Sequence, residues 1–174
     1  DENILRILCD ENPEYKKILA KSASIVKLVD EQTPEICMDA IRINPFALEY
    51  VREQTPEMCL EAVKQNFTAI QYVKDQTPEQ REGFQEICME ALRNCGYVLR
   101  FIREQTEEMC LQAIKDDAEY LQYVISQTPE ICLNAVKQNG LELKLVTDRT
   151  VEICMEAVKT YGCALRYVTD EIQK

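Results

Sequence analysis

The chain has 174 residues, 46% of them hydrophobic, so it is long enough to bury a substantial core. Its 31 Asp and Glu residues outnumber its 20 Lys and Arg residues and give a formal net charge of -11, which opposes binding to a phosphate backbone and favours basic partners. The sequence contains no apolar run of about 18 residues that would span a membrane and no signal peptide, although a start at Asp1 rather than Met allows for a trimmed leader or tag.

One phrase, Gln-Thr-Pro-Glu or a close variant, returns along the chain with a nearly constant period of 22 residues, lengthened to 29 only between Thr77 and Thr106. Its threonines are Thr33, Thr55, Thr77, Thr106, Thr128 and Thr150. Such a period is typical of a solenoid, in which each unit buries its apolar face against its neighbours. We therefore expect an all-α fold, a right-handed or gently curved α-solenoid of tandem 22-residue helix-turn-helix repeats.

The first predicted element, at residues 4–8, matches the second helix of a repeat whose own first helix is absent. Residues 12–15, Asn-Pro-Glu-Tyr, then replace Thr-Pro-Glu-Ile and begin the first helix of the next unit. The second helix of the last repeat is expected at residues 164–168. The chain should therefore form a single domain over 1–174, with about seven helix pairs and an unpaired N-terminal helix. This layout allows self-association through the terminal helices.

The unit at residues 55–73 illustrates why each repeat should fold as two helices. Thr55 is placed to cap the first turn, Pro56 occupies a position where a missing N–H costs nothing, and Glu57 suits the positive helix end. The residues that follow form one apolar stripe, made of Met58, Cys59, Ala62 and Val63. After a turn, residues 69–73 form the shorter second helix.

Seven extra residues, 80–86, lengthen the unit that begins at Thr77. Because seven residues make nearly two turns, a continuous helix would keep its apolar stripe in phase. We expect one long helix over about 78–94 whose first two turns project beyond its neighbours; a looped-out insertion, favoured by Gly83, is the alternative. Phe84 would then be either an exposed interface anchor or folded back onto the preceding unit, and both alternatives stay open.

Six cysteines share one position of successive first helices: Cys37, Cys59, Cys88, Cys110, Cys132 and Cys154. Stacked helices lie about 8 to 10 Å apart and a disulfide needs Cα atoms within about 7 Å, so neighbours in this column should not bond. The chain also lacks the His or Cys-x-x-Cys pairs of a zinc site. We expect the column to pack as small hydrophobic groups in a reducing compartment such as the cytoplasm, with no metal and no cofactor. The candidates for exposure lie near helix ends and are Cys9, Cys95 and Cys163.

An aromatic column marks one position of the second helices: Tyr50, Tyr72, Phe101, Tyr123 and Tyr167. Rows of aromatic residues can stack bases when they lie on an exposed basic face. Here each residue lies beside an inward Val or Ile in an acidic protein. We therefore expect half-buried packing with the hydroxyl at water, and no direct binding of nucleic acid.

Stacking the repeats should also align their charges into two edges. A base in the last turn of each regular first helix suits the helix dipole, and together these bases form a basic ladder: Arg42, Lys64, Arg93, Lys115, Lys137 and Lys159. Carboxylates at the opposite edge form an acidic rim: Glu31, Glu53, Asp75, Glu104, Asp148, Glu35, Glu57, Glu79, Glu108, Glu130 and Glu152. Ten residues of the rim and the insertion are the candidates for partner binding: Arg81, Glu82, Phe84, Gln85, Glu53, Glu57, Asp75, Glu79, Glu104 and Glu108.

Residues 135–143, Ala-Val-Lys-Gln-Asn-Gly-Leu-Glu-Leu, resemble a family of tandem helical repeats known only as a domain of unknown function. The resemblance covers residues 12–168, apart from the insertion and from Asp116-Asp117-Ala118, which replaces Gln-Asn-Gly. It implies the repeat fold and brings no activity, cofactor or catalytic residue with it.

We interpret the chain as a non-enzymatic protein–protein interaction scaffold that presents an acidic rim and a basic ladder, and we expect a protein partner with a basic surface. The alternative is an acidic inhibitor or decoy whose rim imitates the spaced phosphates of nucleic acid in the groove of a nucleic-acid-binding enzyme. An enzyme is not expected, because the chain has no His, no Gly-rich phosphate loop and no convincing carboxylate pair in a predicted cleft.

Overall fold

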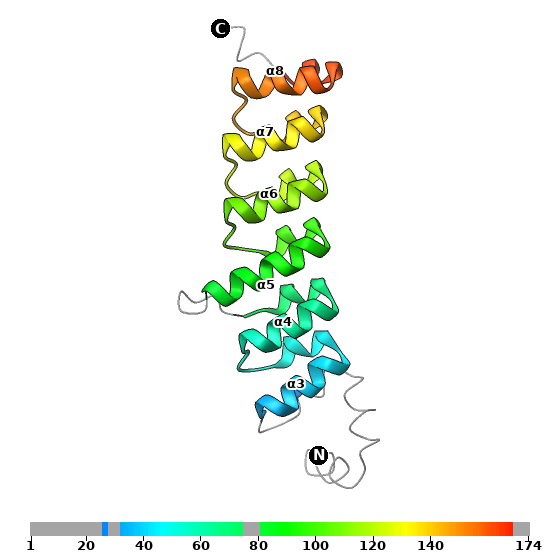
Figure 1. Ribbon diagram of the computed structural model, residues 1–174, viewed down its shortest axis with the longest axis vertical. Helices are drawn as coiled ribbons and strands as arrows, with labels where there is room; N and C mark the ends of the chain where they lie inside the picture. The colour runs from blue at the N-terminus through cyan, green and yellow to red at the C-terminus, as the bar shows by residue number, and fades with distance from the viewer. Residues whose placement is uncertain (1–25, 28–31, 75–80, 169–174) are drawn as a thin grey trace. The chain divides into compact units, whose positions relative to one another are not determined.

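The protein is all-α in the computed structural model, which describes residues 26–27, 32–74 and 81–168 (Figure 1). Over residues 32–74 and 81–168 six α-helices alternate with six short 3-10 helices, and no strand forms in the described residues. The α-helices are α3 (Pro34–Ile43), α4 (Pro56–Gln65), α5 (Arg81–Asn94), α6 (Glu107–Asp116), α7 (Pro129–Gln138) and α8 (Val151–Thr160). The 3-10 helices are η2 (Pro45–Tyr50), η3 (Phe67–Tyr72), η5 (Gly96–Phe101), η6 (Ala118–Tyr123), η7 (Gly140–Leu145) and η8 (Gly162–Tyr167).

The α-helices begin as their sequence predicts. In α4 the Thr55 hydroxyl accepts a hydrogen bond from the backbone N–H of Met58 at 3.3 Å, and Pro56 occupies the first turn. The same cap recurs at the starts of α3, α6, α7 and α8, where it is made by Thr33, Thr106, Thr128 and Thr150. The predicted apolar stripe is buried as well, so the helix-turn-helix repeat is confirmed for the described residues.

The second helix of each repeat is a six-residue 3-10 helix rather than an α-helix. Asn66 begins η3, because its side-chain oxygen accepts from the N–H of Thr68 at 3.0 Å while its own carbonyl accepts from the N–H of Ala69 at 2.9 Å. An Asn or Asp side chain makes the same cap before η2, η6 and η7, at Asn44, Asp117 and Asn139. A polar side chain that bonds two residues ahead thus fixes the sharp turn between the two helices.

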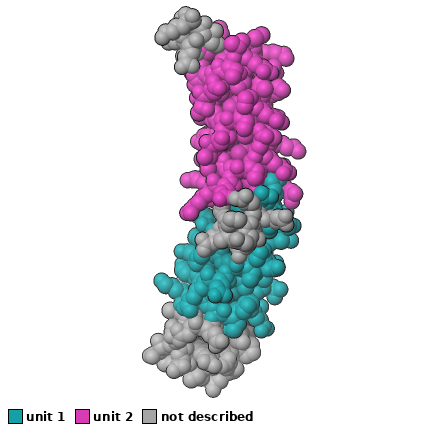
Figure 2. All heavy atoms as spheres, turned by 90° about the vertical axis from the view of Figure 1, so that its left-hand side faces the viewer, with its two compact units in different colours: residues 1–91 teal, residues 92–174 magenta. Residues whose placement is uncertain are grey.

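The chain divides into two compact units, Asp1–Ala91 and Leu92–Lys174, with the boundary inside α5 (Figure 2). Within the first unit α3 packs on α4 and η2 packs on η3. Within the second, α6 packs on α7, α7 packs on α8, and η5, η6, η7 and η8 follow one another in the same way. Stacking of successive repeats is therefore confirmed inside each unit, while a single domain over 1–174 and the hand and curvature of the solenoid stay predictions.

The insertion continues as helix, since α5 covers Arg81–Asn94 without interruption. The predicted start at about residue 78 lies outside the described residues. Phe84 is only 7% exposed, so the exposed-anchor alternative for this residue is wrong. The cause is a neighbour in the same unit: a Cβ added at Gly83 would lie 3.4 Å from the Cβ of Pro56, so this part of α5 lies against the start of α4. The first turn of α5 therefore packs against its neighbour instead of projecting freely.

No helix in the described ranges has the length and apolar character of a membrane span.

Candidate interaction surface

The acidic rim lies in the loops and first turns that lead into the α-helices. Figure 1 shows these loops along the left-hand side of α6, α7 and α8 in the second unit. The rim side chains that the structure describes are exposed: Glu35, Glu53 and Glu57 in the first unit, and Glu104, Glu108, Glu130, Asp148 and Glu152 in the second. Glu31, Asp75 and Glu79 lie outside the described residues.

Two kinds of carboxylate make up this rim. Glu57, in the first turn of α4, has its pKa held below the usual range by its own backbone N–H and by the Thr55 hydroxyl, so it remains ionised where the helix dipole favours negative charge. Glu53, Glu104 and Asp148 lie in the loops instead, outside any helix. The helix dipole does not account for these exposed loop carboxylates, which makes them the better candidates for a binding role.

The insertion contributes less to the surface than the sequence suggested. Arg81 and Glu82 belong to α5, but their side chains lie outside the description. Phe84 is buried, and Gln85 is exposed. Of the four insertion residues chosen for partner binding, Gln85 alone has a side chain that the structure places at the surface.

The basic ladder forms at the opposite ends of the α-helices, in their last turns, as predicted. All six side chains are exposed. Arg42 lies 3.6 Å from Asp39, and Lys159 lies 3.6 Å from Glu156, each pair being three residues apart on its own helix. Exposed pairs of this kind contribute little to stability.

A hollow of about 370 Å³ opens between the loops that precede α6 and α7 in the second unit. Its walls include Glu104, Glu107 and Arg103, together with Ile125, which is 70% exposed. Glu107 is held in place by the Thr128 hydroxyl, which donates to its Oε1 at 2.5 Å. The hollow thus combines two carboxylates with a large exposed apolar side chain.

Sequence reasoning missed Ile125 and Glu107, although a signal for Ile125 exists. The repeat places Arg52, Lys74, Arg103 and Thr147 at the position of Ile125, so an apolar residue there departs from the pattern. Glu107 likewise stands where the other phrases have Pro or Val. Departures from a repeat mark the positions where one unit differs from its neighbours.

A glutamine clamp, which sequence reasoning also missed, joins successive repeats. The Nε2 of Gln54 donates to the carbonyls of Leu48 and Tyr72 at 2.8 and 2.9 Å, and its Oε1 accepts from the N–H of Lys74 at 2.8 Å. Leu48 belongs to η2 and Tyr72 to η3, so one side chain binds the 3-10 helices of two repeats.

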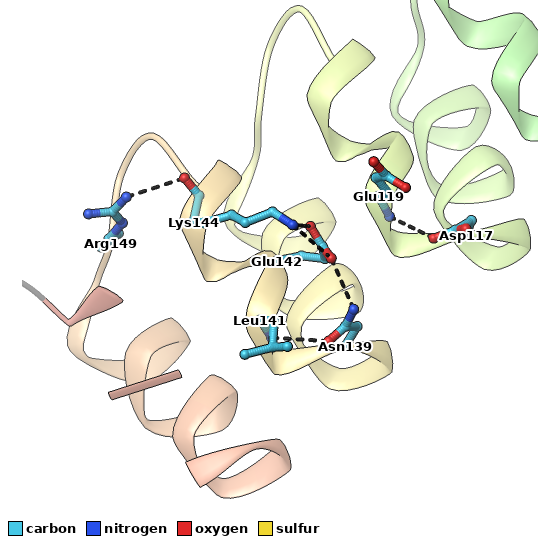
Figure 3. Close-up of polar contacts among 7 residues, drawn as sticks. All are labelled: Asp117, Glu119, Asn139, Leu141, Glu142, Lys144 and Arg149. Carbon is cyan, nitrogen blue, oxygen red and sulfur yellow. Dashed lines mark hydrogen bonds and ion pairs between the residues drawn. The ribbon is translucent and has the colours of Figure 1, made fainter. Parts of the chain in front are cut away.

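The same clamp recurs at Gln32 and Gln105, and Gln127 makes the half of it that binds the following repeat, to the carbonyl of Leu145 and the N–H of Thr147. Arg149 occupies the position in the last repeat. Its guanidinium donates to the carbonyl of Leu143 and to the carbonyl of Lys144, the second of which Figure 3 shows. The first residue of the repeated phrase is therefore structural, and where it is glutamine it adds no charge to the surface.

The six column cysteines are buried and free, as predicted. Burial raises the pKa of Cys59 and Cys88 to about 12 and that of Cys110 to about 11. The thiol of Cys110 lies 3.6 Å from Oε1 of Gln105, so it adds a weak hydrogen bond to the clamp. Cys163 is exposed, Cys95 is half-buried, and Cys9 lies outside the described residues. Over the described part of the chain no three His, Cys, Asp or Glu residues are grouped to hold a metal ion.

The aromatic column is half-buried throughout, as expected. In the second unit it is joined by Tyr97, whose ring centroid lies 5.5 Å from that of Tyr123 in an edge-to-face contact. The Arg100 guanidinium lies 4.9 Å from the Tyr97 ring and 5.8 Å from the Tyr123 ring. These rings of the second unit are engaged with each other and with one arginine.

Among the residues that the structure describes, Glu142 is the charged residue whose side chain is buried; Figure 3 shows its contacts. The Oε1 of Glu142 accepts a hydrogen bond from Asn139 Nδ2 at 2.9 Å. The Oε2 of Glu142 lies 3.2 Å from Lys144 Nζ, with which it forms an ion pair. The equivalent positions in other repeats include Ala47, Ala69 and Ala164. The buried carboxylate is therefore particular to this repeat, and its Oε2 has the ion pair with Lys144 but accepts no hydrogen bond.

Comparison with known proteins gives one family match. The model of a family described as Domain of unknown function (DUF4116) matches residues 33–77 and again residues 128–173, together just over half of the chain. Neither the curated proteins nor the solved structures give a match.

Proposed function

The chain belongs to the DUF4116 family, whose description states no function, and from its surface we propose that it is a non-enzymatic protein–protein interaction scaffold. Its acidic rim would bind the basic surface of a protein partner. The hollow between the loops before α6 and α7 is the observation that carries this proposal.

The chemistry of the hollow suits a Lys or Arg side chain. Such a side chain has an aliphatic stem and a charged head, and the two parts prefer different surroundings. Ile125 offers an exposed apolar wall for the stem, while Glu104 and Glu107 offer carboxylates for the head. Arg103 also lines the hollow and would repel a basic head that came close to its guanidinium.

The rest of the rim would extend this contact along the second unit. Glu108, Glu130 and Glu152 lie in the first turns of α6, α7 and α8, which pack side by side. Repeated contact between charges of opposite sign speeds association and selects a basic partner, but it weakens as salt screens the exposed charges. The buried free thiols support a reducing compartment, so we place the protein and its partner in the cytoplasm.

The test is capture of partners from a native lysate at low salt on three immobilised proteins. The first is the wild type and the second carries Glu104→Gln and Glu107→Gln, which remove two charges while Gln at 107 can still accept from Thr128. The third is a matched control with Lys115→Gln and Lys137→Gln, two exposed charges of the basic ladder in the same unit. A stoichiometric protein should be retained by the wild type and the ladder variant and lost from the rim variant. Equal retention by all three would contradict a role for the acidic hollow.

The identity of the captured protein separates the scaffold from the decoy. A decoy that imitates nucleic acid would hold a nucleic-acid-binding enzyme, and duplex DNA would displace it in competition. A scaffold partner would not be displaced by DNA at the same ionic strength. Displacement by DNA would therefore replace the general scaffold with the decoy as the function of this rim.

A further inference from the structure

We propose that Ser126 is a phosphorylation site whose phosphate fills the gap in the loop carboxylates of the acidic rim. Ser126 lies two residues before Thr128, in the loop between η6 and α7. The same position holds an acid before each of the five other repeated phrases, as Glu31, Glu53, Asp75, Glu104 and Asp148. A phosphoserine would supply the missing negative charge, since a phosphate carries up to about two charges at neutral pH.

The Ser126 hydroxyl is available for modification. The side chain is exposed and lies on a bend, directly after Ile125, which is 70% exposed. Among the described residues none forms a hydrogen bond with this hydroxyl. The hydroxyl of Thr128, by contrast, caps α7 and donates to Glu107. Ser126 can therefore take a phosphoryl group without the loss of a structural contact.

The phosphate would join a hollow that already contains a base for it. Ser126 and Arg103 both line the hollow between the loops that precede α6 and α7. A guanidinium forms paired, charge-assisted hydrogen bonds with phosphate oxygens. Arg103 is also the side chain that would repel a basic head from a partner. Pairing it with a phosphate would remove this repulsion.

Phosphorylation would also change the net charge of the hollow. One base, Arg103, and two acids, Glu104 and Glu107, give its walls a net charge of -1. A phosphate on Ser126 would bring this charge to about -3. The modification should therefore strengthen the binding of a Lys or Arg side chain at this place.

The backbone around Ser126 would hold the phosphate at a defined place on the rim. The N–H of Ile125 donates to Gln105 Oε1 at 2.9 Å, and the side chain of Gln127 donates to the carbonyl of Leu145 at 2.9 Å. Both neighbours of Ser126 in the chain are thus fastened by glutamine clamps. A charge that is held in place before binding costs less entropy when a partner binds to it.

The chemical step is a phosphoryl transfer from ATP that a protein kinase would catalyse. A bond forms between Ser126 Oγ and the γ-phosphorus of ATP, and the bond from that phosphorus to the bridging oxygen of the β-phosphate breaks. ADP leaves, and the hydroxyl proton passes to a base of the kinase. This inference rests on the proposed function, because it makes phosphorylation a regulator of partner binding at the same hollow.

The first experiment maps the modification. The full 174-residue chain is incubated with ATP in a lysate of its own cells, and its phosphorylated residues are identified by mass spectrometry. Phosphate should be found on Ser126. The Ser126→Ala variant should lose phosphoserine that a variant with Ser22→Ala and Ser24→Ala, at the other serines of the chain, retains. A chain without phosphate on Ser126 after this incubation would overturn the proposal.

The second experiment measures the effect on binding, with a fluorescent octalysine peptide as a probe of basic chemistry at low salt. Phosphoserine, incorporated at position 126 during translation, should tighten binding about fivefold relative to the wild type. Gln122→Asp adds a negative charge at an exposed position of η6, away from the hollow, and should change binding by less than about twofold. The variant with Glu104→Gln and Glu107→Gln is measured beside them, and circular dichroism establishes that every protein folds.

The results separate this inference from the proposed function. If the Glu104→Gln and Glu107→Gln variant binds the peptide as tightly as the wild type, the hollow does not recognise basic groups and the proposed function fails. If that variant binds more weakly but phosphoserine at position 126 brings no gain, the hollow stands and its regulation by phosphate is wrong. Equal gains from phosphoserine and from Gln122→Asp would also overturn the inference, because net charge alone would then explain them.

Discussion

At the scale of single residues, the glutamine clamp is the contact that most directly couples one repeat to the next. Gln105 Nε2 donates to the carbonyls of Leu99 and Tyr123 at 3.2 and 2.9 Å, and its Oε1 accepts from the N–H of Ile125 at 2.9 Å. These partners are backbone groups of η5, of the end of η6 and of the loop that follows η6. The part-buried Gln105 side chain binds backbone groups of two repeats. Removing this side chain leaves those backbone groups without their hydrogen-bond partner.

Gln105→Ala should lower the free energy of unfolding by about 2 kcal/mol, because the two carbonyls and the N–H lose this partner. The measurement is urea unfolding of both proteins, followed by circular dichroism. Gln122→Ala, at an exposed glutamine of η6, is the control and should change the free energy by less than about 0.5 kcal/mol. Equal unfolding midpoints for Gln105→Ala and the wild type would mean that the clamp contributes nothing.

At the scale of helices, the sequence predicts the N-termini of the α-helices best, because a threonine caps them. At the start of α7 the Thr128 hydroxyl accepts from the N–H of Ile131 at 3.3 Å, and it also donates to Glu107. Thr128→Ala should cost about 1 kcal/mol in urea unfolding, whereas Thr128→Ser keeps the hydroxyl and should cost much less. If the two variants lose the same amount, the capping hydrogen bond is not the source of the loss.

The long helix α5 gives a second prediction at this scale. Phe84 is buried while its neighbour Gln85 is exposed. Phe84→Ala should therefore lower the free energy of unfolding by about 3 kcal/mol through the cavity that it leaves. Gln85→Ala, one residue along the same helix, should stay within about 0.5 kcal/mol of the wild type. A similar small effect of both substitutions would restore the exposed-anchor alternative for Phe84.

At the scale of the whole molecule, the column of buried thiols makes stability depend on pH. Each unfolded thiol has a pKa of about 8.5, whereas burial raises the pKa of folded Cys59 and Cys88 to about 12. At a pH between these two pKa values the thiols are ionised in the unfolded chain but still protonated in the folded chain. The free energy of unfolding therefore falls as pH rises above about 8.5, and the thiols do not affect it at lower pH. The effect recurs in both units, because every described column cysteine has a raised pKa.

Cys88→Ala isolates one of these thiols. Relative to its stability at pH 7, the wild type should lose about 2 kcal/mol more than the variant on going to about pH 10, because the variant has no thiol to ionise at this position. Urea unfolding at the two pH values measures the difference, and the titration of Lys and Tyr cancels between the proteins. An identical decline in both would show that Cys88 does not contribute.

Much of this molecule could be predicted from sequence because the repeat shows each local rule several times. The cap at Thr55, the apolar stripe of α4 and the burial of Cys59 follow from helix geometry alone. The 3-10 form of η3 did not follow, because six residues are too few for a periodic signal to separate it from an α-helix.

The clamp and the hollow needed tertiary information. Gln54 bonds carbonyls 6 residues before it and 18 residues after it, and no local pattern specifies such partners. The hollow depends on Glu107 and Ile125, which depart from the repeat, while sequence reasoning followed what the repeats share. Burial of Phe84 depends on how closely α5 approaches α4, which the phase of its own helix does not determine.

The clamp also bears on how such a chain changes length. Gln32, Gln54 and Gln105 each bind a carbonyl before them in the chain and a carbonyl and an N–H about 20 residues after them, and Gln127 binds the carbonyl and the N–H that follow it. A duplicated 22-residue segment therefore arrives with a complete set of donors and acceptors, and adding it leaves no backbone group orphaned at either junction. A segment of any other length would set the amide out of register with its carbonyls. Duplication of whole units thus lengthens this chain while keeping its hydrogen bonds between repeats. A seven-residue insertion is tolerated only where it prolongs a helix in phase.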